Sequence, residues 1–161
     1  MRVLAVATTL CLLAGIVPAS AQSVNLDFTG TVIPGCTLSA SDGGTLGLDY
    51  TTGTTLGSEE AGGDAAHVTI LSIGANTLTV GAPTRTGQAA GGYIATGEAI
   101  QVRYTGATGL SSLNVAYTSS QTTNPIATIA ASVLTVHNRI TNPNGFPNGN
   151  YSTRTVVTCA P

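Results

Sequence analysis

The sequence predicts an all-β protein built as a sandwich of short strands. Apolar and polar residues alternate in many short runs with the period of two that extended chains have. Gly, Asn and Pro interrupt these runs at short intervals, and no long segment has the helical period. With two Phe and no Trp in the chain, we expect a thin core of Val, Ile, Leu and Ala with a few Tyr.

The amino terminus has the layout of a secretory signal peptide. The charged start MR precedes an apolar run over 3–17, and the small-residue site ASA follows at 19–21. We expect residues 1–21 to be cleaved, which leaves 140 residues beginning at Gln22, about one domain. The apolar run is short for a membrane span, and no later segment resembles one. The chain is therefore predicted to be exported, without an integral membrane segment after cleavage.

Cys36 and Cys159 are the cysteines of the exported chain. Two cysteines in an oxidising compartment indicate one disulfide, which would tie the start of the domain to its last strand. Closing a loop of that length is worth roughly 4–5 kcal/mol in the chain-entropy model. A redox or metal role has little support, because neither cysteine belongs to a C-x-x-C pair.

Charge is sparse along the whole chain. Charged residues make up 7% of the sequence, Lys is absent, and the formal net charge of −2 becomes −3 once Arg2 is removed with the signal peptide. A nucleic-acid partner is excluded by this composition, because a phosphate backbone requires clustered positive charge. Sheet edges also lack the charges that usually prevent pairing with another chain, which suggests that an edge is used for pairing.

The most regular alternation lies at the start of the exported chain. Over residues 24–32, one face of an extended strand carries the side chains of Val24, Leu26, Phe28, Gly30 and Val32. The other face carries polar residues, and Pro34–Gly35 follow as a bend before Cys36. We divide the chain into a signal peptide at 1–21, an amino-terminal arm with its hinge at 22–35, and a sandwich domain at 36–161.

The domain itself is predicted to hold roughly eight short strands. In chain order we expect a strand over 45–50, a Gly- and Thr-rich loop over 51–64, a hairpin formed by 67–73 and 77–80, and a flexible stretch over 84–92. Strands over 99–104 and 112–117 follow. The apolar run over 126–140 is one long strand or a strand preceded by irregular chain, with a short helix as a further alternative, and a closing strand lies over 150–159. One face of the closing strand would carry Tyr151, Thr153, Thr155, Val157 and Cys159.

No catalytic or metal-binding constellation is present in the sequence. His67 and His137 stand apart inside predicted strands, without Cys or His at ligand spacing. No G-x-S-x-G turn accompanies the many Ser and Thr residues. Glu59, Glu60 and Asp64 could hold calcium through carboxylate oxygens, but a solvated acidic loop is the simpler interpretation. We therefore expect a protein that is not an enzyme and that uses no cofactor or metal.

The two ends of the chain resemble a known family. Residues 24–38, VNLDFTGTVIPGCTL, resemble the amino-terminal segment of bacterial fimbrial subunits of the chaperone-usher class, and the closing strand over 149–158 is similar to that of spore coat protein U-like domains. The resemblance implies an immunoglobulin-like sandwich that lacks its last strand. It also implies that the arm of the next subunit fills the groove, with backbone hydrogen bonds for affinity and alternate side chains for register.

The chain departs from the family pattern in three places. Its second cysteine stands third from the end, where many fimbrial subunits have it early or midway. Leu71 or Ile73 occupies the position at which related domains carry a cysteine, and the last strand ends in Cys159, Ala160 and Pro161 without the aromatic residue that periplasmic chaperones engage. The partners implied are identical subunits, a periplasmic chaperone and an outer-membrane usher.

Two functional interpretations stand at this point. In the first, the protein is the structural subunit of a pilus on the bacterial cell surface, periplasmic in transit, and its arm is a donor strand for a neighbour. In the second, residues 23–33 are the first strand of an ordinary secreted monomer that acts as an adhesin or carbohydrate-binding module. The scarcity of aromatic residues is an objection to carbohydrate binding.

Overall fold

The computed structural model describes residues 27–31, 35–87, 91–108, 112–126 and 129–161. The chain divides into two units, Met1–Thr31 and Val32–Pro161. Of the first unit, residues 27–31 are described, and they have no regular secondary structure. All the strands of the described residues lie in the second unit.

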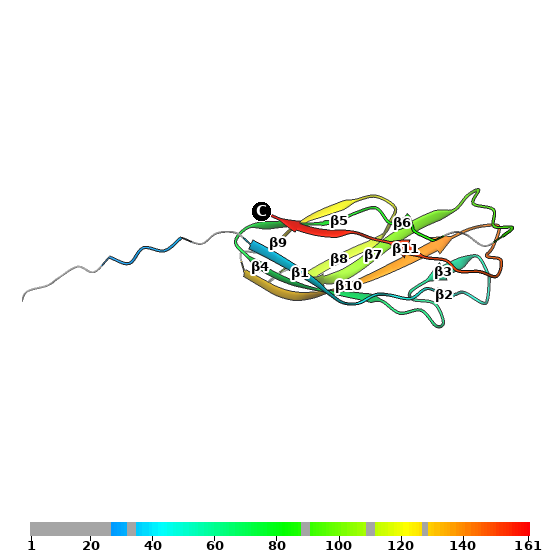
Figure 1. Ribbon diagram of the computed structural model, residues 1–161, viewed down its shortest axis with the longest axis horizontal. Coiled ribbons are helices and arrows are strands. Elements are labelled where there is room, and N and C mark those ends of the chain that lie inside the picture. Colours follow the sequence, from blue (N-terminus) through cyan, green and yellow to red (C-terminus); the bar gives the residue numbers. More distant parts are fainter. Residues whose placement is uncertain (1–26, 32–34, 88–90, 109–111, 127–128) are drawn as a thin grey trace, which may run out of the picture. The chain divides into compact units, whose positions relative to one another are not determined.

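The larger sheet has β10 at its centre (Figure 1). Its main path runs β1–β4–β10–β7–β8, and the short strands β3 and β2 continue beside β10 beyond the end of β4. These strands are β1 (Gly35–Asp42), β2 (Gly47–Leu48), β3 (Thr55–Gly57), β4 (Ala66–Ile73), β7 (Ala99–Ala107), β8 (Ser112–Thr118) and β10 (Ile129–Thr141).

A second, smaller sheet covers the first. It has the order β12–β5–β9, and a two-stranded ribbon, β11–β6, lies alongside. The strands are β5 (Asn76–Val80), β6 (Thr84–Arg85), β9 (Thr122–Ile126), β11 (Thr153–Arg154) and β12 (Val157–Ala160). Every pairing in the described part of the chain is antiparallel, and no helix occurs there. The all-β prediction is confirmed.

The core consists of the inward residues of both sheets. Ile70, Val102 and Leu134 of the larger sheet pack with Leu78 and Val80 of the smaller one, and all five are almost completely buried. The aromatic side chain at the centre is Tyr104, whose hydroxyl accepts a hydrogen bond from the Asn124 amide at 2.7 Å. This core is aliphatic, as the composition predicted.

The predicted hairpin of 67–73 and 77–80 is wrong. Both segments are strands, β4 and β5, but they belong to different sheets. Both edges of β4 are already occupied, by β1 and by β10, so β5 has no edge of β4 to pair with. The chain crosses between sheets at Gly74, which has a φ of +83°, and at Asn76, whose buried amide lies 2.7 Å from the Ser72 hydroxyl.

Other boundaries differ from the predictions. The strand expected over 45–50 is reduced to β2 with a bridge from Thr45 to Asp64. The loop over 51–64 contains β3, and the flexible stretch over 84–92 contains β6. Twelve strands occur in the described ranges. The strands β1, β3, β6 and β9 were not predicted, and the predicted closing strand is divided in two. The long strand β10 is present over 129–141, where the alternative was a short helix.

The closing strand alternates as predicted but is interrupted. From Tyr151 to Ala160 each residue of the face that carries Tyr151 and Cys159 is partly buried, and each residue of the other face is exposed. Hydrogen bonding divides the segment into β11 and β12, because β11 pairs with β6 and β12 pairs with β5. No helix long and apolar enough to span a membrane occurs in the described part of the chain.

Candidate functional site

The smaller sheet ends at an open edge. Within the described residues β12 pairs with β5 alone, from Val157 to Ala160, so its other edge has unpaired backbone groups. The outermost strand of the larger sheet on this side is β1, which pairs with β4 and not with β12. The two sheets are therefore not joined by hydrogen-bonded strands along this side of the sandwich, and this side is the candidate site.

A groove opens along this edge. We call it the edge groove; its cavity has a volume of about 290 Å³. One wall is the segment 153–157 that leads into β12, the other is the segment 43–46 after β1, and the floor comes from β4 and β10. The lining residues are Gly43, Gly44, Leu46, Ser58, Asp64, Ala66, Val68, Val136, Asn138, Thr153, Arg154, Thr155 and Val157.

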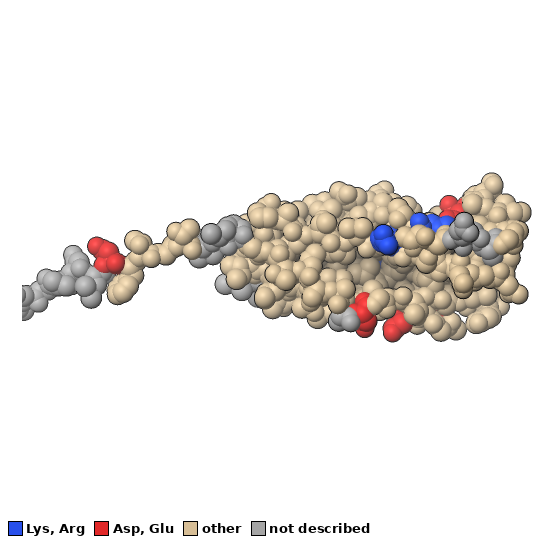
Figure 2. Space-filling view, viewed as in Figure 1, with Lys and Arg blue, Asp and Glu red and all other residues tan. Residues whose placement is uncertain are grey.

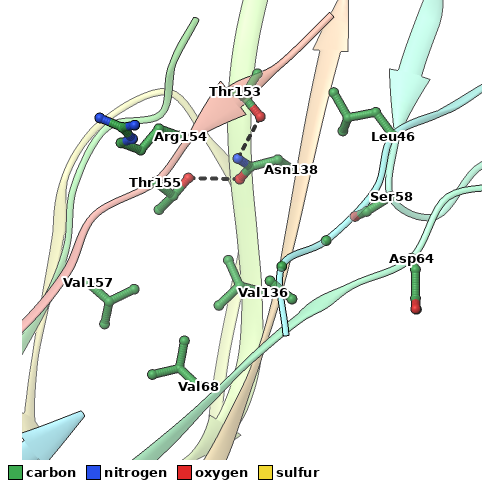
Figure 3. Close-up of a pocket in the computed structure, with 13 residues that line it drawn as sticks. Leu46, Ser58, Asp64, Val68, Val136, Asn138, Thr153, Arg154, Thr155 and Val157 are labelled. Carbon is green, nitrogen blue, oxygen red and sulfur yellow. Dashed lines mark hydrogen bonds between the residues drawn. The ribbon is translucent and has the colours of Figure 1, made fainter. Parts of the chain in front are cut away.

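The floor of the edge groove has an apolar part and a polar part (Figure 3). Val68, Val136 and Val157 lie close together at one end, and Val136 belongs to the core. At the other end the Asn138 amide donates a hydrogen bond to the Thr153 hydroxyl and accepts one from the Thr155 hydroxyl, each at 2.9 Å. These two bonds tie β10 of the larger sheet to the wall of the groove.

Few charges lie at the edge groove. Figure 2 shows a mostly uncharged face with a hollow that has basic side chains to one side and acidic side chains to the other. Of the charged lining residues, Asp64 accepts a hydrogen bond from the Ala65 amide at 2.9 Å, and Arg154 is exposed. The groove therefore offers apolar contacts and unpaired backbone groups rather than a charged ligand site.

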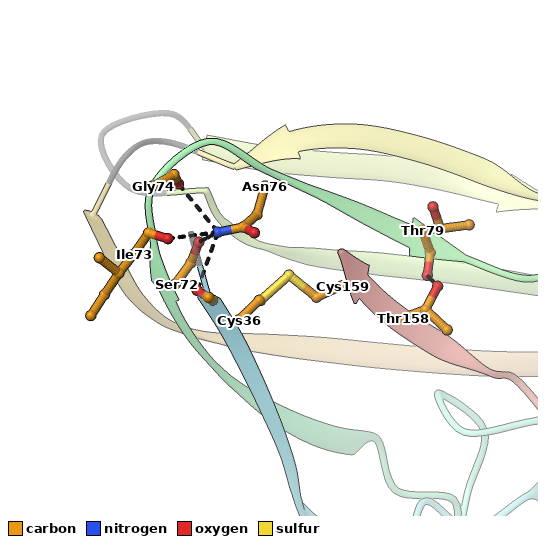
Figure 4. Close-up of a disulfide and its surroundings, with 9 residues drawn as sticks. Cys36, Ser72, Ile73, Gly74, Asn76, Thr79, Thr158 and Cys159 are labelled. Atoms are coloured by element: carbon orange, nitrogen blue, oxygen red, sulfur yellow. Dashed lines mark hydrogen bonds between the residues drawn. A yellow bond between two sulfur atoms is a disulfide. The ribbon is translucent and has the colours of Figure 1, made fainter. Parts of the chain in front are cut away.

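The predicted disulfide joins Cys36 of β1 to Cys159 of β12 (Figure 4). The two Cα atoms are 5.9 Å apart, which is an ordinary separation for a cystine. Both cysteines are partly buried and pack against the core. The bond, which we call the staple, links the edges of the two sheets next to Gly35, where the arm joins the domain.

The structure places the predicted arm residues only in part. Phe28 is 92% exposed, and Gly30 has open space around it, since a Cβ added there would meet no atom within 4 Å. Val24, Leu26 and Val32 lie outside the described residues. Residues 27–31 pair with no strand, and a fully exposed Phe leaves a large apolar side chain uncovered.

Comparison with protein-family models, with curated proteins and with solved structures finds no match.

The histidines and the acidic loop form ordinary structural contacts. His67 Nδ1 lies 3.2 Å from an Asp42 carboxylate oxygen, and His137 Nδ1 lies 3.0 Å from the Ser58 hydroxyl. Glu59 is bound to Arg103 and to the Tyr117 hydroxyl rather than turned toward the other acids. No group of three or more His, Cys, Asp or Glu in the described ranges is arranged to hold a metal ion.

A polar network lies around Glu59. Its carboxylate accepts a hydrogen bond from the Tyr117 hydroxyl at 2.7 Å and one from Arg103, while the guanidinium of Arg139 lies 3.9 Å from the centre of the Tyr117 ring. The Tyr117 hydrogen bond, with the charge of Arg103, holds the pKa of Glu59 below its usual range. Burial, and then the Glu59 carboxylate, raises the pKa of Tyr117 well above its ordinary value.

Sequence reasoning did not find the lining of the edge groove. Asn138 lies within an apolar run, and its inward position follows only from the alternation of β10 around the core residues Val136 and Ile140. A polar residue at an inward position of a long strand could have indicated that this end of the strand faces a cavity rather than the core.

Proposed function

We propose that this protein is the structural subunit of an extracellular filament, assembled head to tail by insertion of one subunit's arm into the edge groove of the next. The observation that carries the proposal is the open edge of β12 beside a groove whose floor is apolar at the end nearer β12. A strand added at such an edge gains backbone hydrogen bonds, and its alternate side chains fill the groove. Because the contact is heterologous, it propagates as a fibre.

The strand order supports an immunoglobulin-like sandwich without its last strand. In such domains the strands A, B, E and D form one sheet, and C, F and G form the other. Here β1, β4, β10 and β7 have the order of A, B, E and D, and β5 and β12 stand as C and F. The place of G, next to β12, has no strand among the described residues.

The arm has the pattern that this place requires. Its inward face carries Leu26 and Phe28, which suit a groove with an apolar floor, and Gly30 permits close approach of the backbone. A G strand runs antiparallel to F, so the inserted arm runs from the staple toward β11 and leaves the groove at the opposite end of the domain. Only residues 33 and 34 then separate it from β1 of its own domain, so consecutive domains would lie end to end.

Such a subunit requires partners for export and assembly. Identical subunits are the main partner, and a periplasmic chaperone and an outer-membrane usher would deliver them to the bacterial cell surface. We assign the chain no catalytic role. A chaperone would have to cover the open edge during transit, because an unpaired strand edge beside apolar surface promotes aggregation.

Deletion of residues 22–33 from the exported protein tests the proposal. The truncated subunits are expected to fold with a chaperone but to form neither filaments nor ladders on unheated gels. A matched pair of substitutions sharpens the result: Phe28→Ser should weaken assembly strongly, and Thr29→Ser, on the outward face of the same arm, should leave it unchanged. Filaments that persist without the arm would reject donor-strand assembly, and a stable monomer from the intact chain would favour the secreted-adhesin alternative.

A further inference from the structure

We propose that the staple is the end stop of the edge groove and sets the register in which the arm of a second copy lies along β12. The inference rests on the proposed function, since it names the partner of each position in the same groove. It follows from the distance between the two sheet edges at the staple and from the position of the cavity beyond it.

The sheet edges are too close together at the staple to admit a strand. Neighbouring strands in a sheet lie about 4.8 Å apart, so a strand inserted between two others needs about 9.6 Å between them. The Cα atoms of Cys36 and Cys159 are only 5.9 Å apart. The sulfur atoms also join the inward faces of the two strands, where both cysteines pack against the core. An inserted strand therefore stops before Cys159.

The groove opens immediately beyond this point. Its wall on the β12 side runs from Thr153 to Val157, a length of about 17 Å for five extended residues. The inward positions of this wall are Thr153, Thr155 and Val157, all partly buried. The groove thus offers three inward positions to an arm that has five inward residues.

The best match of these positions places Phe28 opposite Thr155. Residues directly opposite each other in an antiparallel pair have side chains on the same face. With the bulkiest side chain in the middle of the cavity, Leu26 lies opposite Val157 and Gly30 lies opposite Thr153. Val24 then falls at the staple, outside the groove.

Registers displaced by two residues fit less well. A displacement toward the staple would bring Leu26 level with Cys159, where the 5.9 Å separation leaves no space, so Leu26 as well as Val24 would be lost from the groove. A displacement away from it would move Phe28 to Thr153, farther from the apolar part of the floor formed by Val68 and Val136. The staple therefore disfavours the first register, and the polarity of the floor disfavours the second.

Paired cysteine substitutions in the assembled full-length protein read the register directly. Leu26→Cys with Val157→Cys is expected to give crosslinked multimers on non-reducing gels, at least tenfold more than two matched controls. Val32→Cys with Thr153→Cys reports displacement toward the staple, and Val24→Cys with Val157→Cys reports displacement away from it. All three pairs retain Phe28 and Gly30, and peptide mapping checks that the native disulfide is kept.

Removal of the staple tests its role as the stop. In a Cys36→Ala/Cys159→Ala background the Val32–Thr153 crosslink should rise to a level comparable with the Leu26–Val157 crosslink, because the groove is then open past residue 159. An unchanged single register in that background would overturn the inference, as would a dominant Val32–Thr153 or Val24–Val157 crosslink with the staple intact. The crosslinks with the staple intact are measured in the presence of the native disulfide, so this test remains available even if the staple-free chain does not fold. Filaments in which no pair crosslinks would instead reject the proposed function.

Discussion

The two ends of the edge groove are tied to the larger sheet by different kinds of link. At one end the Cys36–Cys159 bond joins β12 covalently to β1. At the other, the Asn138 side chain holds Thr153 and Thr155 by two hydrogen bonds. The covalent link acts mainly on the unfolded chain, whereas the hydrogen bonds act on the folded one. The first therefore contributes to the stability of the whole domain, and the second to the shape of the groove.

The largest expected effect is that of removing the staple. Cys36→Ala/Cys159→Ala opens a loop with a sequence separation of 123 residues, and the free energy of unfolding should fall by about 5 kcal/mol. That is a large share of the stability of a typical domain, which is about 5–15 kcal/mol. Denaturant unfolding of oxidised wild type and the double variant measures it. A loss below about 1 kcal/mol would contradict the contrast between the two links.

Asn138→Ala should have a smaller and more local effect. It removes the partner of two hydroxyl groups at a partly open cavity that water can enter, so we expect a loss of about 1–2 kcal/mol in unfolding free energy. Asn114→Ala, at an exposed position of β8, is the matched control and should change stability by less than about 0.5 kcal/mol. Equal losses in the two variants would mean that the hydrogen bonds at this end of the groove contribute nothing specific.

The sequence pattern predicted where strands lie but not how they pair. Short β-prone runs identified β4, β5, β7 and β8, and a long apolar run identified β10, because each has one face in the core. It could not show that β5 leaves the sheet of β4, because alternation says which face is buried and not which edge is paired. The two-residue strand β6 is set by tertiary pairing with β11, so no local pattern in the stretch 84–92 could reveal it.

The candidate site was predictable only at its covalent end. Two cysteines in an exported chain leave one intramolecular pairing, and Cys36–Cys159 is that pair. The hydrogen-bonded end depends on contacts of Asn138 with two threonines, 15 and 17 residues later in the chain. Asn and Thr are too common in this chain for these contacts to be predicted from the sequence. The groove between the two links depends on how the two sheets are arranged, which could not be inferred from the sequence pattern.

The smallest effect is expected for a third link, on the outer surface of the larger sheet. Glu59, just after β3, accepts hydrogen bonds from Arg103 of β7 and Tyr117 of β8, and its side chain is 37% exposed. An exposed ionic link of this kind contributes about 0.2–1 kcal/mol. We therefore expect Glu59→Gln to destabilise the domain less than either link of the edge groove does.

The pH dependence of the Glu59→Gln effect provides the sharper test. Because the folded protein lowers the pKa of Glu59 from its ordinary value near 4.5, its contribution is fully present above that pH and is lost as the pH falls through the lower, folded-state pKa. The stability difference between wild type and Glu59→Gln, measured by denaturant unfolding, should be fully present at pH 7 and should shrink as the pH falls below about 4.5. Glu60→Gln, which changes the neighbouring acid of the same loop, is the matched control. A difference that is constant between pH 7 and pH 3 would show that packing of the Glu59 side chain, and not its charge, makes this third link. Bond type would then not explain why the Glu59 link is the weakest of the three.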